Sequence, residues 1–187
     1  MLKSSHIRNL TISALCTALC VVLPIVFHII PNAGAVLLPM HIPVLLCGMV
    51  CSWQYGLICG VLGPVLSSVL TGMPPAAILP SMIVELGFYG CVSGLMMEHI
   101  RTKRLYLDLY ASLVTAMLVG RVASGIAKAL IFAPGTSFTA WATASFVTAL
   151  PGISIQLILL PTLVVALTRS GLIPARYCRA GSFFSRK

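Results

Sequence analysis

The sequence contains very few acidic residues. Only three of its 187 residues are Asp or Glu, and charged residues of both signs make up 8% of the chain. Soluble domains carry about 25% charged and about 45–50% apolar residues, whereas 59% of this chain is apolar. A water-exposed surface of mixed charge cannot be built from so few charges, which excludes an ordinary soluble enzyme and a disordered tail. We therefore predict an all-α, polytopic membrane protein.

The net charge of +9 does not indicate a nucleic-acid-binding protein. DNA-binding proteins gather basic residues on one element with polar support. Here the Lys and Arg residues form short clusters between long apolar runs. We predict contact with the lipid bilayer and none with nucleic acid.

A disulfide framework is also lacking. The seven cysteines are odd in number and show no paired spacing; six lie in apolar stretches, and Cys178 lies in the basic tail. Cys16 and Cys20, like Cys47 and Cys51, are four residues apart, which leaves a metal site as one interpretation. A structural zinc site needs further ligands, so we favour small apolar packing residues and predict no metal site.

The sequence has none of the short motifs of nucleotide binding or hydrolysis. It contains no phosphate-cradling GxxxxGK[ST] loop, no HExxH, no GxSxG and no paired carboxylates. An intramembrane enzyme would have to assemble its catalytic group from His28, His41, cysteines or Glu85 by folding alone. We predict no catalytic residue and no directly bound cofactor.

Six apolar stretches are candidates for membrane-spanning helices, each of which needs about 20 apolar residues. The first five cover residues 8–30, 36–51, 54–70, 76–97 and 106–132, and the sixth ends near residue 168. The second is short. Pro151-Gly152 could divide the sixth into an outer and a spanning piece, an interruption that neighbouring helices can accommodate.

The positions of the basic residues predict the orientation. With six spans, ten of the twelve Lys and Arg residues lie on one side, and the turns at 31–39, 71–75 and 133–136 carry no charge. Basic residues favour the cytoplasmic side, so both termini are predicted inside. The chain is read as one membrane-embedded domain over 1–187, with cytoplasmic segments 1–7 and 170–187.

The start of the chain also has features of a cleavable signal peptide. Lys3 and Arg8 precede an apolar run that is followed by Ala33-Gly34-Ala35. That run is about 20 residues long, however, against the 7–15 of a signal-peptide core. We therefore interpret it as a retained first span.

Three charged residues lie deep within the predicted spans: Glu85, Arg121 and Lys128. Such residues are costly in a bilayer and mark function or a structural pair. At 1.5 Å per residue, Glu85 and Arg121 both lie about 14–16 Å from the outer surface. Their matching depth is compatible with an ion pair that ties two helices together, or with side chains that face a ligand. Lys128 either snorkels to the outer interface or binds an anion.

Other polar residues lie close to the predicted outer loops. His41 opens the second span and could be a helix cap, a proton carrier or a ligand contact. His28 and Asn32, near the first loop, have the same alternatives. The candidate substrate-binding residues are therefore Arg121, Lys128, Glu85, His41 and Asn32.

Small residues mark two predicted helix surfaces. Gly56 and Gly60 have the small-xxx-small spacing that permits close helix approach, and the span that they belong to ends in the rigid loop Thr71-Gly72-Met73-Pro74-Pro75. Ala14 and Ala18 share one face of the first span. They either form a groove for another helix or pack against other helices within the fold.

The order of these motifs resembles a known family. A basic start with Ala14-xxx-Ala18 is followed by Met40-His41-Ile42-Pro43 and a glycine-rich third span; Gly72-Met73-Pro74-Pro75, then Glu85 with Tyr89-Gly90, then Gly120-Arg121 come next. With six helices in this length, the chain resembles the substrate-binding S component of energy-coupling factor (ECF) vitamin transporters. The likeness covers most of the chain.

The resemblance implies a mechanism and partners. S components capture one micronutrient from outside and dock, through the alanine motif, on a membrane coupling subunit that carries two ATPases; toppling in the membrane then delivers the ligand inward. Ala14 and Ala18 would be the docking surface here, in the plasma membrane of a prokaryote. A pocket with Arg121, Lys128 and one acid favours an anionic ligand, and the resemblance favours a small vitamin such as pantothenate.

A stand-alone secondary transporter is the main alternative. It would couple solute movement to protons or sodium through an intramembrane carboxylate, for which Glu85 is the candidate. Such transporters commonly show internal two-fold repeats, and we find none in the sequence.

Overall fold

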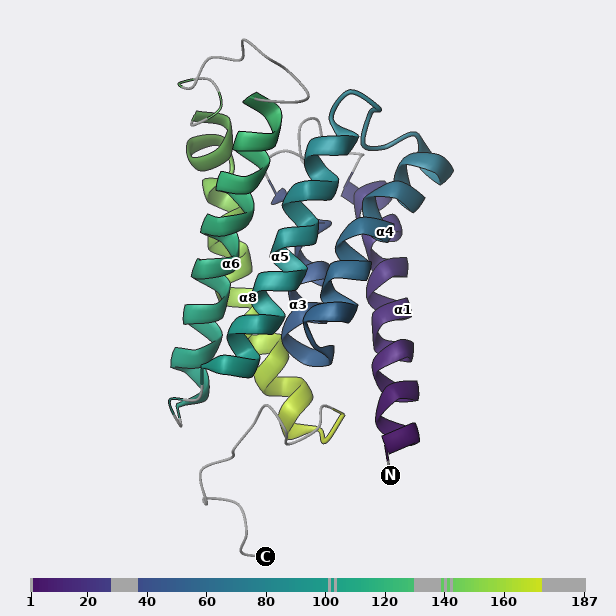
Figure 1. Cartoon of the computed structure of the whole chain (residues 1–187), viewed down its shortest axis with the longest axis vertical. Helices are drawn as coiled ribbons and strands as arrows, with labels where there is room; N and C mark the ends of the chain where they lie inside the picture. Colours follow the sequence, from purple (N-terminus) through teal and green to yellow (C-terminus); the bar gives the residue numbers. More distant parts are fainter. Residues whose placement is uncertain are drawn as a thin grey trace, which may run out of the picture.

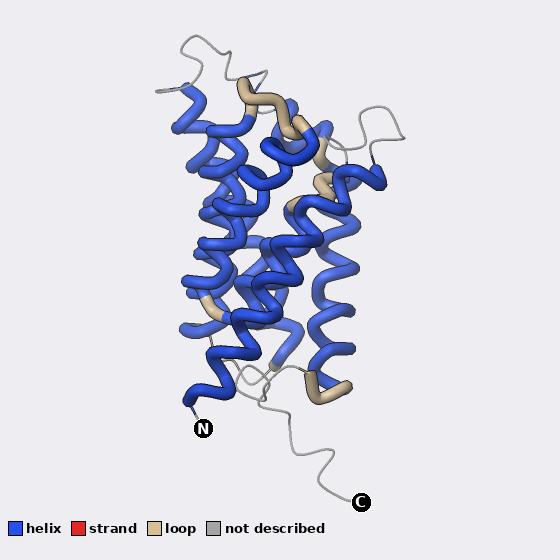
Figure 2. Tube along the Cα trace, turned by 90° about the vertical axis from the view of Figure 1, so that its right-hand side faces the viewer, coloured by secondary structure: helices blue, strands red, loops and turns tan. Residues whose placement is uncertain are grey.

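The computed structural model describes residues 2–27, 37–100, 102, 104–129, 139, 141 and 143–172, and these ranges contain helices and loops but no strand. The helices form one elongated bundle (Figures 1 and 2). In chain order they are α1 (Leu2–Phe27), α3 (His41–Cys51), α4 (Trp53–Thr71), α5 (Leu79–His99), α6 (Leu105–Ala127), the π-helix η2 (Thr143–Thr148) and α8 (Leu150–Arg169).

Five of these helices are long and apolar enough to cross a bilayer: α1, α4, α5, α6 and α8. The second predicted span, 36–51, is represented by α3, which has only 11 residues. At 1.5 Å per residue it is about 16 Å long, roughly half of the about 30 Å of a hydrocarbon core. The all-α prediction is confirmed, with one of the six predicted spans shortened to a half-length helix.

The short helix α3 occupies the interior of the bundle. All of its residues except Ile42 and Leu46 are buried, and α1, α4 and α5 pack around it. A helix that is apolar all round is stable in lipid or in an enclosed interior such as this one. α3 ends at Cys51, the φ of 149° at Ser52 breaks the helical geometry, and α4 begins at Trp53.

Glycines let α4 and α5 approach closely, as the spacing of Gly56 and Gly60 predicts. A Cβ atom on Gly56 would overlap the carbonyl oxygen of Gly90, and one on Gly60 would overlap that of Leu86. Only glycine permits this backbone-to-backbone contact.

The last span begins where the proline predicts a break. The π-helix η2 ends at Thr148, Ala149 forms a turn, and α8 starts at Leu150 with Pro151 in its first turn. Proline is accepted there because that N–H has no helical partner. η2 and α8 are thus the separate pieces that the sequence suggests.

The two sides of α1 differ in their surroundings. Cys16 and Cys20 are buried against the bundle, whereas Ala14 and Ala18 are exposed on another side of the helix. Among the described residues, the two alanines thus lie outside the buried side of α1, and their docking role stays a prediction. Cys47, Cys51 and Cys59 are buried as well, so these cysteines are core packing residues.

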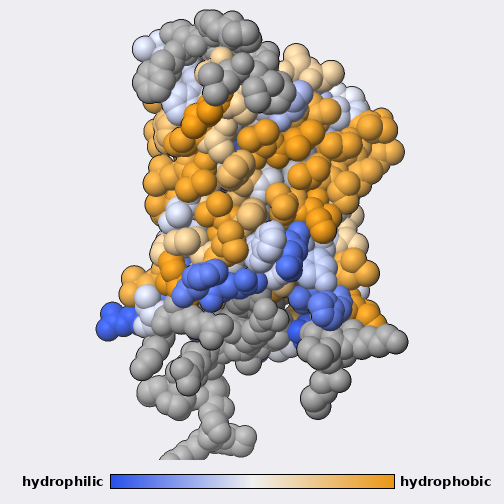
Figure 3. Space-filling view, viewed as in Figure 1, coloured by the Kyte–Doolittle hydropathy of each residue, from blue (hydrophilic) through white to orange (hydrophobic). Residues whose placement is uncertain are grey.

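The outer surface is apolar over most of its height. Exposed Leu, Ile and Val side chains occur on α1, α4, α6 and α8, and in Figure 3 hydrophilic residues gather near the lower end of the face shown. Such a belt would be unfavourable in water and suits lipid. The protein is a multi-pass membrane protein.

The beginning of α1 and the end of α8 lie at the same end of the bundle, which is the lower end in Figure 1. Ala76, in the loop at the opposite end, and Ser170, just after α8, are both exposed. With Cys178 replaced by serine, we expect Ala76→Cys to react with a membrane-impermeant maleimide from outside intact cells and Ser170→Cys to react only after lysis. The reverse pattern would contradict the predicted inside location of both termini.

Candidate functional site

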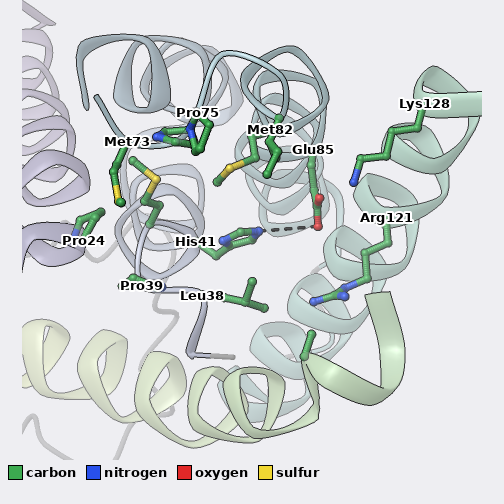
Figure 4. Close-up of a pocket in the computed structure, with 14 residues that line it drawn as sticks. Pro24, Leu38, Pro39, His41, Met73, Pro75, Met82, Glu85, Arg121 and Lys128 are labelled. Atoms are coloured by element: carbon green, nitrogen blue, oxygen red, sulfur yellow. Dashed lines mark ion pairs between the residues drawn. The ribbon is translucent and has the colours of Figure 1, made fainter. Parts of the chain in front are cut away.

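A cavity of about 340 Å³ lies near the upper end of the bundle. Its walls come from the upper parts of α1, α5 and α6, from the segment that leads into α3, from the loop between α4 and α5, and from Ala149. Small-molecule pockets run from about 300 to 1,000 Å³, so this cavity suits a small ligand. Figure 4 shows its lining.

The loop between α4 and α5 forms one wall of the cavity and is tied to the end of α4. The Ser68 hydroxyl donates a hydrogen bond to the Pro74 carbonyl over 2.9 Å, and the Met73 N–H donates to the Thr71 hydroxyl over 3.2 Å. Together with the fixed dihedrals of two prolines, these bonds hold Met73, Pro74 and Pro75 against the cavity.

The charged residues of the cavity come from α5 and from α6 and its end. Glu85 lies on α5, Arg121 on α6 and Lys128 directly after α6. The Glu85 carboxylate accepts hydrogen bonds from Tyr89, one turn along α5, and from Ser124 on α6, each over 3.3 Å. A Cβ atom on Gly120 would overlap the Tyr89 ring, so this glycine lets α6 pack against Tyr89 and the carboxylate that it holds.

His41 contributes from the start of α3. Its Nε2 lies 3.6 Å from Oε1 of Glu85, and its ring meets the Tyr89 ring edge-on at 5.1 Å between centroids. The side chain is 3% exposed. Among the interpretations of His41, the structure supports the one in which this residue lines the cavity, where it contacts Glu85.

Arg121 is a buried cation in the cavity wall with two unsatisfied nitrogens. It is 3% exposed, and neither its Nε nor its Nη2 has a hydrogen-bond partner. Its Cζ lies 5.8 Å from the centre of the Phe146 ring, a cation–π distance that offsets only part of the cost of burial. A buried guanidinium with free N–H groups facing a cavity is a ready site for an anion.

Of the two alternatives for Glu85 and Arg121, the structure does not show the ion pair between them. Among the described residues, the ion-pair partner of Glu85 within 4.0 Å is His41. Equal depth placed Glu85 and Arg121 on the same cavity, but depth does not define the direction of a side chain about the helix axis. Tyr89, Ser124 and His41 hold the carboxylate, and Nε and Nη2 of Arg121 are left without a hydrogen-bond partner.

The rest of the lining is largely apolar. We call the residues Pro24, Met73, Pro74, Pro75 and Met82 the methionine–proline wall. Leu38, Pro39, Met40, Ile78 and Ala149 complete the cavity. Methionine side chains are flexible and polarisable and adapt to ligands of irregular shape.

A family model for the substrate-specific component of ECF transporters matches residues 8–164. The chain belongs to this family. The match includes every helix that lines the cavity, and the resemblance seen in the sequence is confirmed. The comparisons with curated proteins and with solved structures gave no significant match.

Membership of this family establishes the general role of the S component. It is a substrate-specific membrane subunit of an ECF transporter, with a small-molecule substrate and an association with the ECF transporter module. Proteins of this family are transporter subunits, not enzymes. Within the part of the chain that the structure describes, no three His, Cys, Asp or Glu side chains are grouped to hold a metal ion.

Four of the five predicted substrate-binding residues of the S component line one cavity: His41, Glu85, Arg121 and Lys128. The fifth, Asn32, lies outside the described residues, as does His28. Their contact with substrate stays a prediction.

Sequence reasoning missed the partners of Glu85 and the methionine–proline wall. Tyr89 follows Glu85 by four residues and Ser124 follows Arg121 by three, which are spacings that share a helix face and could have signalled the network. The wall combines α1, a loop and α5, and no local pattern in the sequence connects these segments.

The Glu85 network leads to a stability prediction. Hydrogen bonds to a charged group contribute about 1.5–3 kcal/mol each, and Glu85→Gln removes the charged acceptor of Tyr89 and Ser124. The change is therefore expected to lower the thermal stability of the S component. In a double-mutant cycle, Glu85→Gln should couple with His41→Asn by about 0.5–3 kcal/mol, measured by thermal unfolding in detergent. Additive effects would contradict the Glu85–His41 contact. Stronger coupling of Glu85→Gln to Arg121→Gln would instead support an ion pair between Glu85 and Arg121.

Proposed function

We propose that this S component captures a small anionic water-soluble vitamin, pantothenate-like in charge and size, from outside a prokaryotic plasma membrane. The observation that carries the proposal is Arg121, a buried guanidinium with two unpartnered nitrogens in the cavity wall. Lys128 lines the same cavity. Burial of an unpaired charge is costly, and a ligand carboxylate would compensate it.

Delivery to the cytoplasm would depend on partners. Ala14 and Ala18 form an exposed stripe of small side chains on α1, which would let a helix of the coupling subunit approach closely. ATP would be hydrolysed by two ATPases below the coupling subunit. The S component itself would need no bound cofactor.

Native mass spectrometry of the purified S component, together with calorimetric titration, tests the substrate proposal. We expect a co-purified small anion, and binding of pantothenate in preference to the cation thiamine. A neutral or cationic ligand would refute the anion proposal. Uptake that proceeds without ATP and without a coupling subunit would instead favour a secondary transporter.

Lys128 provides a separate test of charge recognition. A charge-assisted hydrogen bond to a ligand carboxylate contributes about 1.5–3 kcal/mol, so Lys128→Met should weaken binding roughly ten- to a hundredfold. Methionine keeps the apolar stem and removes the charge. Arg169→Met, at the exposed end of α8, is the matched control and should bind as wild type. Unchanged affinity of Lys128→Met, measured by calorimetry, would mean that Lys128 only snorkels.

A further inference from the structure

The two cations of the cavity and most of its methionine–proline wall lie on different sides, with Met82 beside Glu85 on α5. In Figure 4, Arg121 and Lys128 stand on one side, and Pro24 and Met73 stand on the opposite side. Glu85 and His41 lie between them, with the dashed contact joining the two. A ligand that satisfies both sides must have its charge at one end and an uncharged surface at the other.

The fixed charges limit the charge of the ligand. Arg121 and Lys128 supply two positive charges, and Glu85 supplies one negative charge. The formal charges of these three residues sum to about +1, which one carboxylate compensates. A dianion would leave a buried negative charge without a partner, at a high cost.

We infer that the substrate is an elongated monocarboxylate. Its carboxylate binds Arg121 and Lys128, and its uncharged, largely aliphatic end contacts the methionine–proline wall. The inference rests on the proposed function and narrows it, because it excludes compact monoanions, dicarboxylates and phosphate monoesters. It also assigns Met82 and the loop residue Met73 as specificity-determining residues.

A ligand panel separates this inference from the proposed function. Calorimetric titration of the full chain in nanodiscs would use pantothenate, biotin and lipoate as elongated monocarboxylates. Nicotinate, folate and pyridoxal phosphate represent the compact monoanion, the dicarboxylate and the phosphate monoester, and thiamine is the cation. We expect one of the first three to bind at least about a hundredfold more tightly than any of the others, a difference of about 2.8 kcal/mol.

Each outcome of the panel has a distinct meaning. Tightest binding of nicotinate, folate or pyridoxal phosphate would overturn the elongated-monocarboxylate proposal while leaving an anionic vitamin as substrate. Tightest binding of thiamine would overturn both proposals.

The orientation of the ligand is tested with the acid that binds and its primary amide. Lys128→Met should weaken binding of the acid by about tenfold or more and leave the weaker binding of the amide unchanged. Met82→Gln should weaken both ligands by the same factor, about four- to fifteenfold, which corresponds to one or two lost methylene contacts. Met96→Gln, on the same helix but outside the cavity, is the matched control.

Two results would overturn the orientation. One is that Met82→Gln and Met73→Gln both bind the acid as tightly as wild type does. The other is equal sensitivity of acid and amide to Lys128→Met. Thermal unfolding of each unliganded variant shows whether it is folded, and the comparison of two ligands on one variant is independent of its stability.

Discussion

Replacing Ala14 by tryptophan is expected to reduce vitamin uptake to the level of cells that lack the coupling subunit, while binding to the isolated S component stays unchanged. Ala14 and Ala18 are exposed on α1, so a larger side chain meets no residue of the described fold. It would hold a docking helix away from the small-residue stripe, where contact depends on close backbone approach.

The measurements are uptake of labelled vitamin in cells that contain the complete transporter and calorimetric binding to the purified protein. Leu15→Trp is the matched control, since Leu15 is 62% exposed on the same helix and already has a large side chain. It should leave uptake nearly intact. Loss of binding together with uptake in Ala14→Trp would show that the alanine is needed by the fold, and normal uptake would remove the proposed docking role.

Replacing Arg121 by methionine is expected to cause the largest loss of affinity. Truncating one partner of a buried hydrogen-bonded charge pair costs about 2–5 kcal/mol, which is roughly a 30-fold to several-thousandfold increase in Kd. Without ligand, the same change should leave the melting temperature unchanged or raise it, because the guanidinium nitrogens Nε and Nη2 have no partner to lose.

Calorimetry with the bound vitamin and thermal unfolding without it provide the two readouts. Arg104→Met, at the opposite end of α6, is the control and should change neither. A strong loss of stability in the unliganded Arg121→Met protein would indicate a structural role. Unchanged affinity would exclude Arg121 from the anion site.

Local sequence patterns predicted a helix correctly where the properties of that helix alone determine its position in the chain. Apolar length placed α1, α4, α5, α6 and α8 correctly, because a bilayer requires that length in any fold. Pro151 marked the start of α8, since proline acts on its own turn of the chain. The short α3 was overestimated, because apolar composition does not distinguish a helix that faces lipid from one enclosed by other helices.

The residues of the candidate site could be predicted from the sequence, but the contacts between them could not. Glu85, Arg121 and Lys128 stood out because charge within an apolar run is costly in any arrangement, and depth along each helix brought them to one level. Whether His41 or Arg121 contacts Glu85 depends on the rotation of the helices about their axes and on the position of α3 inside the bundle. Neither quantity is encoded in the spacing of residues along one helix.

By itself, the sequence determined that this is an all-α membrane protein with a few costly charges near one end of its helices, because composition and length act locally. Only the tertiary structure decided that Tyr89, Ser124 and His41 hold Glu85 and that two nitrogens of Arg121 have no hydrogen-bond partner. It also decided that methionines and prolines from distant segments form one wall of the cavity. These are contacts between elements far apart in the chain, and they depend on how the helices pack.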